Sequence, residues 1–138
     1  MKTQRVVTWA ASITDKPGGL AAKLKTLAAG GVNIEFIIAR RAPNKPGTGV
    51  VFITPVQGPK QIRAAKTAGF HSTKKLHTVR IEGADRPGLG ARLTQALARQ
   101  GLNLRGLSAA AIGKKFVCHI AVDSEAAATK AVRTLRGL

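Results

Sequence analysis

The feature that most limits the fold of this 138-residue chain is an internal repeat at a constant offset of seventy residues. The stretch DKPGGLAAKLKTLAAGGVNI at 15–34 aligns without a gap to DRPGLGARLTQALARQGLNL at 85–104, and eight positions are identical. The same offset relates Lys60, Arg63 and Lys66 to Lys130, Arg133 and Arg136. A duplication explains these matches, so we predict two homologous units, residues 1-74 and 75-138.

Each copy shows the same order of predicted elements. Alternating apolar residues over 7–13 and 79–81 predict a first strand, and a leucine stripe after each Pro-Gly predicts a helix that stops near Gly31 or Gly101. A second strand opens at Asn33 or Asn103, a third covers 50–56 or 116–122, and a second helix follows over 59–68 or from Ser124.

This order predicts an α+β fold of two ferredoxin-like (βαββαβ) units, each with two helices on one face of an antiparallel sheet. The stretch GFHSTKK at 69–75 is expected to supply the last strand of the first unit. The sequence stops after the second helix of the second unit, so that unit lacks its last strand and is either three-stranded or completed by a partner. An open sheet edge of this kind predicts a homodimer in which strands of different units continue one sheet.

The repeated turns have a physical role at the start of a helix. Asp15 and Asp85 can accept the unpaired N–H groups of a helix start, and proline suits a first turn because it has no N–H to leave unpaired. Gly18 and Gly88 leave the backbone open to a ligand or another chain. A helix start and a nearby asparagine amide can together hold a carboxylate and an amine.

The sequence Asp-x-Pro-Gly, a leucine-rich helix and then Gly-Val/Leu-Asn-Ile/Leu resembles the ACT domain in both copies, over nearly the whole chain. The resemblance implies a regulatory module without a cofactor, in which an amino acid or similar ligand binds at an interface between ACT units and a partner protein receives the signal. It also implies that the turn of one unit and the asparagine of another hold this ligand. The implied ligand-binding residues are Asp15, Lys16, Pro17, Gly18, Asn33, Asp85, Arg86, Pro87, Gly88 and Asn103.

The formal net charge of +17 supports an alternative function, the electrostatic binding of nucleic acid or another polyanion. The two basic trios are spaced three residues apart, which places each trio along one ridge of a helix. Sequence-specific RNA binding by the sheet is disfavoured, because Tyr is absent and few Phe residues fall on the strands. A solvated basic surface explains the same charge without a partner.

Catalytic and metal-binding sites are not predicted. Cys118 and His119 are neighbours on a strand and point to opposite faces, so they cannot form a nucleophile–base pair. His71, His77 and His119 lack metal-ligand spacing. A single cysteine excludes an internal disulfide and suits the cytoplasm. The start of the sequence lacks a long apolar segment, so neither a signal peptide nor a membrane anchor is expected.

Overall fold

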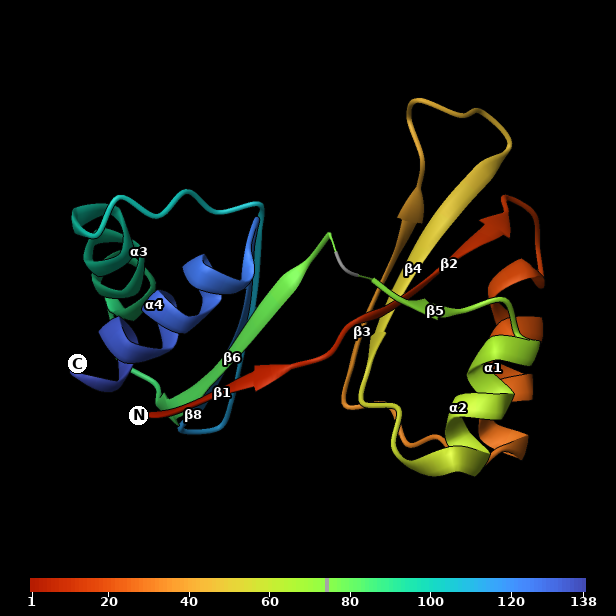
Figure 1. Ribbon diagram of the computed structural model, residues 1–138, viewed down its shortest axis with the longest axis horizontal. Coiled ribbons are helices and arrows are strands. Elements are labelled where there is room, and N and C mark those ends of the chain that lie inside the picture. Colours follow the sequence, from red (N-terminus) through yellow and green to blue (C-terminus); the bar gives the residue numbers. More distant parts are fainter. Residues whose placement is uncertain (74) are drawn as a thin grey trace. The chain divides into compact units, whose positions relative to one another are not determined.

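The computed structural model describes residues 1–73 and 75–138, and Lys74, at the expected boundary between the units, lies outside the described residues. The chain divides into two compact units (Figure 1). The first unit is Val7–Thr73, and the second unit is Met1–Val6 together with Lys74–Leu138. Met1–Val6 therefore lies with the second unit, whereas the sequence suggested a first unit of 1-74 and a second of 75-138.

The first unit has the predicted βαββαβ order. Its sheet has the order β3-β4-β2-β5 and is antiparallel throughout. The elements are β2 (Trp9–Thr14), α1 (Gly19–Ala29), β3 (Phe36–Arg41), β4 (Thr48–Thr54), α2 (Gly58–Thr67) and β5 (His71–Ser72). The two-residue β5 pairs with the start of β2, which confirms the strand expected from GFHSTKK.

The second unit reaches the same architecture by another chain path. Its antiparallel sheet has the order β1-β6-β8-β7, with α3 and α4 on one face (Figure 1). The elements are β1 (Lys2–Val6), β6 (His77–Ala84), α3 (Leu89–Arg99), β7 (Gly106–Ile112), β8 (Lys115–Val122) and α4 (Glu125–Arg136). The prediction of four helices in two antiparallel α+β units is confirmed.

The place of the missing last strand is taken by β1, from the start of the same chain. Its register runs from Lys2 opposite Glu82 to Val6 opposite Thr78. The second unit thus lacks a strand after α4, as predicted, but it is neither three-stranded nor completed by a second chain. The missing strand therefore gives no reason to expect a homodimer.

Side chains tie β1 to α4. Arg5 donates from Nη1 and Nη2 to the two carboxylate oxygens of Glu125, at 2.7 and 3.0 Å. The hydrogen bond from Arg5 lowers the pKa of Glu125 below its ordinary value. Ser124 caps α4 as predicted, because its Oγ accepts from the Ala127 N–H at 3.0 Å.

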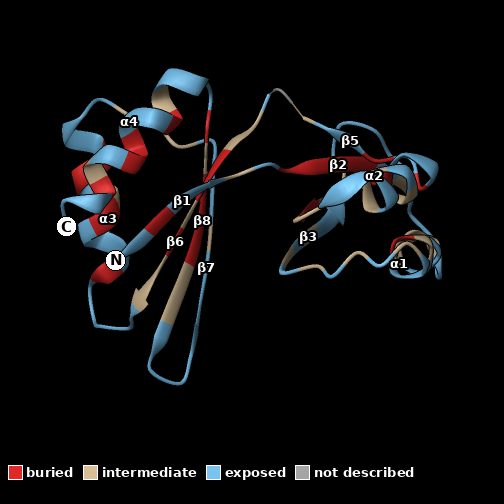
Figure 2. Cartoon of the chain, turned by 60° about the horizontal axis from the view of Figure 1, so that its bottom comes forward, coloured by how far each residue is buried: buried red, intermediate tan, exposed pale blue. Residues whose placement is uncertain are grey.

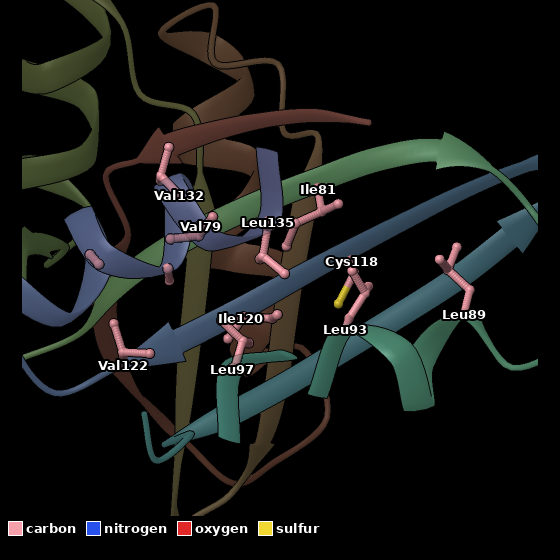
Figure 3. Close-up of a cluster of buried hydrophobic side chains, with 12 residues drawn as sticks. Val79, Ile81, Leu89, Leu93, Leu97, Cys118, Ile120, Val122, Val132 and Leu135 are labelled. Atoms are coloured by element: carbon pink, nitrogen blue, oxygen red, sulfur yellow. The ribbon is translucent and has the colours of Figure 1, made fainter. Parts of the chain in front are cut away.

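Each unit encloses its own apolar core between sheet and helices. Figure 2 shows the buried positions of the second unit concentrated along β6 and β8 and on the inner sides of α3 and α4. In Figure 3, leucines of α3 and α4 point toward β-branched residues of these strands. The fully buried side chains here include Val79, Ile81, Leu93, Leu97, Ile120, Val122 and Leu135, and the core of the first unit includes Trp9, Leu27, Val51, Ile53, Ala65 and Phe70.

Candidate functional site

The first repeated turn connects β2 to α1. The Asp15 N–H donates to the Gly47 carbonyl at 3.0 Å, and the Lys16 N–H donates to the Thr14 carbonyl at 2.9 Å. Gly18 is the N-cap of α1 with φ of 82°, a left-handed conformation that favours glycine. Pro17 precedes this cap, so it lies outside the helix rather than in its first turn.

The Asp15 carboxylate does not cap α1, contrary to the prediction. In the described part of the chain no side chain makes a capping hydrogen bond at the start of α1, and Asp15 Oδ2 instead accepts from Arg41 Nε at 2.8 Å. Arg41 is the last residue of β3, so this pair joins the turn to the end of a sheet edge. The pair is solvent-accessible, since the Arg41 side chain is 84% exposed, and such pairs contribute at most about 1 kcal/mol.

The second repeated turn has the same backbone but different surroundings. The Asp85 N–H donates to the Lys114 carbonyl at 2.8 Å, and Gly88 is the N-cap of α3 with φ of 80°. Within residues 75–138 no side chain caps α3, so Asp85 is not a helix cap either. The position that corresponds to Arg41 is Ala111, so this turn has no equivalent of the Asp15–Arg41 pair.

Two cavities border the first turn. One has a volume of about 230 Å³ and is lined by Ile13, Thr14, Asp15, Lys16, Leu20, Ala39, Arg40, Arg41 and Gly49. The other has a volume of about 600 Å³ and is lined by Ser12, Ile13, Thr14, Lys16, Pro17, Gly18, Gly19, Ala22, Lys23 and Thr48. The residues Asp15, Lys16, Pro17 and Gly18, predicted as ligand-binding, therefore all face a cavity.

The two asparagines lie away from the turns of their own units. Asn33 and Asn103 are exposed and precede the strands they were predicted to open, because β3 begins at Phe36 and β7 at Gly106. In the first unit the turn precedes α1 and Asn33 follows it, and the eleven residues of α1 span about 16 Å. The structure therefore does not bring a turn and an asparagine of the same unit together.

Sequence reasoning missed the Arg41 side chain and the Arg40 backbone as parts of the site. Both lie at the end of β3, twenty-five residues after the turn, and β4 lies between β3 and β2 in the sheet. The available signal was the Arg-Arg pair at the end of a predicted edge strand, but its proximity to Asp15 depends on the sheet order.

Cys118 and His119 do not form a catalytic pair. Cys118 belongs to the core of the second unit, where burial raises the pKa of its thiol to about 11, so it is a poor nucleophile near neutral pH. Burial, and secondarily the charge of Arg80, lower the pKa of His119 to about 4. No cluster of His, Cys, Asp or Glu suited to a metal ion occurs among residues 1–73 and 75–138.

The basic trios are exposed on two equivalent helices. Lys60, Arg63 and Lys66 lie on α2, and Lys130, Arg133 and Arg136 lie on α4. The inner sides of the same helices carry buried residues, such as Ala65 and Leu135. Each trio thus forms the solvent face of a helix packed on its core. Among the described residues, no helix is long and apolar enough to cross a membrane.

Comparison with known proteins identifies the fold of both units. Residues 77–137 match the ACT domain family. Protein BT0572 from Bacteroides thetaiotaomicron is similar in structure with a TM-score of 0.79 at 17% identity, over 98% of this chain and 89% of that one. The ligand-free regulatory subunit of aspartate kinase from Thermus thermophilus has a TM-score of 0.67 at 20% identity, over 99% and 94%. The regulatory subunit of aspartate kinase from Thermus flavus has a TM-score of 0.60 at 19% identity, over 99% of this chain and 94% of that one. No sequence among the curated proteins matches this chain.

Proposed function

Because the chain carries an ACT domain over residues 77–137 and a first unit of the same fold, we propose that it is a non-catalytic regulatory module that binds an amino acid or a similar small ligand. The observation that carries this proposal is the pair of cavities at the first turn, which Asp15, Lys16 and the start of α1 line together. Unpaired N–H groups and the dipole at a helix start attract a carboxylate.

We further propose that the ligand site is completed by the asparagine of a neighbouring ACT unit. Asn33 lies at the far end of α1 from the turn of its own unit, so it can contact only a ligand held by another turn. The same reasoning applies to Asn103 and the Asp85–Gly88 turn. Such an arrangement makes ligand binding sensitive to how ACT units assemble, and a partner protein can read that assembly.

A homodimer remains part of this proposal on grounds other than the missing strand. Strands β3 and β7 are the outer strands of their sheets, and exposed apolar residues occur on both, with Leu107 and Ile112 on β7 and Ile37 on β3. Open sheet edges with apolar residues favour pairing with another chain. Sedimentation equilibrium tests this directly, and a monomeric mass at micromolar concentration would contradict it. We place this function in the cytoplasm on the argument from the single cysteine.

The test is a thermal-shift screen of the twenty amino acids and of nucleotides. A ligand that binds only the folded protein stabilises it by RT ln(1 + [L]/Kd), so a millimolar ligand produces a measurable increase in Tm. We expect Asn33→Ala or Asn103→Ala to remove this increase and to leave the Tm without ligand nearly unchanged. Asn44→Ala, in an exposed loop that lines neither cavity, is the matched control.

The second candidate function is binding of nucleic acid, and the exposed trios on α2 and α4 favour it. Phosphate contacts by lysine and arginine make affinity fall steeply with salt. The triple charge reversal Lys60→Glu, Arg63→Glu and Lys66→Glu should then lower both the affinity for duplex DNA and the salt slope. If Asn33→Ala has no effect on any ligand-induced increase in Tm, and if the affinity for polyanions falls steeply with salt, nucleic-acid binding replaces the first candidate function.

A further inference from the structure

We propose that the cavity of about 230 Å³ at the first turn binds an acidic amino acid, aspartate or glutamate, and that the second turn does not. This inference rests on the proposed function and adds the chemical class of the ligand and the unit that holds it. Its basis is the set of charges around the cavity and the loss of the same features in the second unit.

The cavity combines an apolar floor with a charged rim. Ile13, Leu20, Ala39 and Gly49 are the apolar lining residues. Gly49 is buried, and a Cβ at this position would lie 2.8 Å from the Arg40 carbonyl oxygen and 3.0 Å from Ile13 Cγ1. The absence of a side chain at position 49 therefore lets the strands approach closely. A volume below the range of about 300–1,000 Å³ typical of drug-sized ligands suits a small metabolite better than a nucleotide.

The rim carries two cationic side chains and one acid. Lys16 and Arg41 lie on the rim with the carboxylate of Asp15, which gives a net charge of +1 from two positive groups and one negative group. Arg40 lines the cavity through its backbone, because its side chain lies on the opposite face of β3 from that of Arg41. An acidic amino acid has the complementary set, because its two carboxylates pair with cations and its ammonium pairs with Asp15. A neutral amino acid leaves one of the cation contacts unused.

The Asp15–Arg41 pair can accept such a ligand without a large rearrangement. Arg41 donates to Asp15 through Nε, so its two η nitrogens can hold a carboxylate in the bidentate geometry that guanidinium favours. The exposed position of the Arg41 side chain means that this pair contributes little to the fold. Asp15 can then turn toward a ligand ammonium at small cost.

The second turn lacks these features at matching positions. The seventy-residue offset places Ala110 and Ala111 where the first unit has Arg40 and Arg41. Strand pairing makes Phe116 the counterpart of Gly49, because Gly83 lies opposite Phe116 as Ile13 lies opposite Gly49. The partly buried Phe116 ring packs against the core of the second unit. The corresponding position of the second unit therefore has a bulky ring in place of an open floor, and no arginine at the position of Arg41. The cationic residues beside this turn are Arg86, Lys114 and Lys115, since the Asp85 N–H donates to the Lys114 carbonyl and Lys115 pairs with Ala84.

The experiment is a titration of ¹⁵N-labelled protein with L-glutamate, L-aspartate, their amides L-glutamine and L-asparagine, and the dicarboxylate glutarate. We expect glutamate or aspartate to bind about 3- to 10-fold more tightly than its amide, because the amide cannot form one of the two charge-assisted pairs with the rim. The amide resonances of Ala39 and Gly49 should shift, and those of Ala109 and Phe116 should not. Glutarate should bind more weakly than glutamate, because it has no ammonium for Asp15.

The decisive variant is Arg41→Gln, which removes one rim charge and leaves a similar side-chain length. We expect a loss of about 3- to 10-fold in glutamate affinity, with unchanged Trp9 fluorescence as evidence of an intact first unit. Arg99→Gln, on the exposed end of α3, makes the same charge change away from the cavity and should have no effect.

The results separate this inference from the proposed function. If amides bind as tightly as acids, or if Arg41→Gln changes affinity less than 2-fold, the acidic-ligand inference is wrong and the proposed function stands. Glutarate binding as tight as glutamate binding also overturns the assignment to an amino acid at this cavity. If none of these ligands shifts any resonance and none of the twenty amino acids raises the Tm in the thermal-shift screen, both the inference and the proposed function fail.

Discussion

Replacing Gly49 with alanine should destabilise the first unit because the strands approach too closely for a side chain there. The added Cβ would lie 2.8 Å from the Arg40 carbonyl oxygen, inside the ordinary contact distance, and that oxygen belongs to the neighbouring strand backbone. Overpacking of this kind costs about 1–3 kcal/mol. The lower chain entropy of alanine in the unfolded state recovers about 0.4–1 kcal/mol, so we expect a net loss of about 1–2 kcal/mol.

Urea unfolding followed by tryptophan fluorescence measures the free energy of unfolding of the first unit, where the substitution lies. Trp9 is the only tryptophan, is 8% exposed and lies in the core of the first unit. With a slope of about 1 kcal/mol per molar urea, the midpoint should fall by about 1–2 M. The same substitution should weaken glutamate binding, because the new methyl group occupies the cavity floor.

Gly106→Ala is the matched control in β7. The nearest atom to a Cβ at Gly106 is 4.0 Å away, so alanine fits without strain and should be neutral or slightly stabilising, as measured by circular dichroism. If Gly49→Ala changes the free energy of unfolding as little as Gly106→Ala does, then β3 and β4 do not approach as closely beside the cavity as we describe, and the cavity floor is not as we describe it either.

Three further outcomes concern the second unit. The Thr3 hydroxyl is buried without a hydrogen-bond partner among the described residues, so Thr3→Val should raise the free energy of unfolding by about 1 kcal/mol, as measured in urea; a loss of stability would contradict this account. The His119 pKa is lowered from 6.5 to about 4 in the folded protein. Between pH 6.5 and pH 4 the unfolded chain therefore binds a proton at His119 that the folded protein does not, so the free energy of unfolding should fall as the pH decreases through this range. In the His119→Asn variant the Tm should depend less on pH over this range, and a pH dependence equal to that of the unsubstituted protein would contradict this prediction. The Cys118 thiol should stay unreactive toward a disulfide reagent at pH 8 until urea unfolds the second unit, and rapid labelling of the folded protein would show that it is not buried.

Sequence alone predicted most of the architecture because the decisive signals are local or repeated. The leucines of α1 and α3, the stops at Gly31 and Gly101, with φ of 81° and 73°, and the Ser124 cap all act within one turn of a helix. Because the repeat has a constant offset of seventy residues, an element predicted in one unit could also be predicted at the matching position of the other unit. These features depend on neighbours in the sequence, which a pattern can reveal.

The errors concern contacts between distant residues. Lys2–Val6 was joined to the first unit because it precedes β2 directly, and nothing local shows that it pairs with β6 seventy-five residues later. Asp15 was predicted as a cap because its position suits one, but Arg41 competes for the same carboxylate from the end of β3. The ligand-binding roles predicted for the turns and for Asn33 and Asn103 remain predictions.

The most direct test of a small-ligand site at the first turn is one pair of ¹⁵N–¹H titrations on the same sample, first with the twenty amino acids and then with a short DNA duplex. The account predicts saturable shifts at Lys16, Ala39 and Gly49 with at least one amino acid, and none of these shifts with DNA. Shifts confined to the basic trios of α2 and α4, produced by DNA alone and weakened by salt, would contradict it.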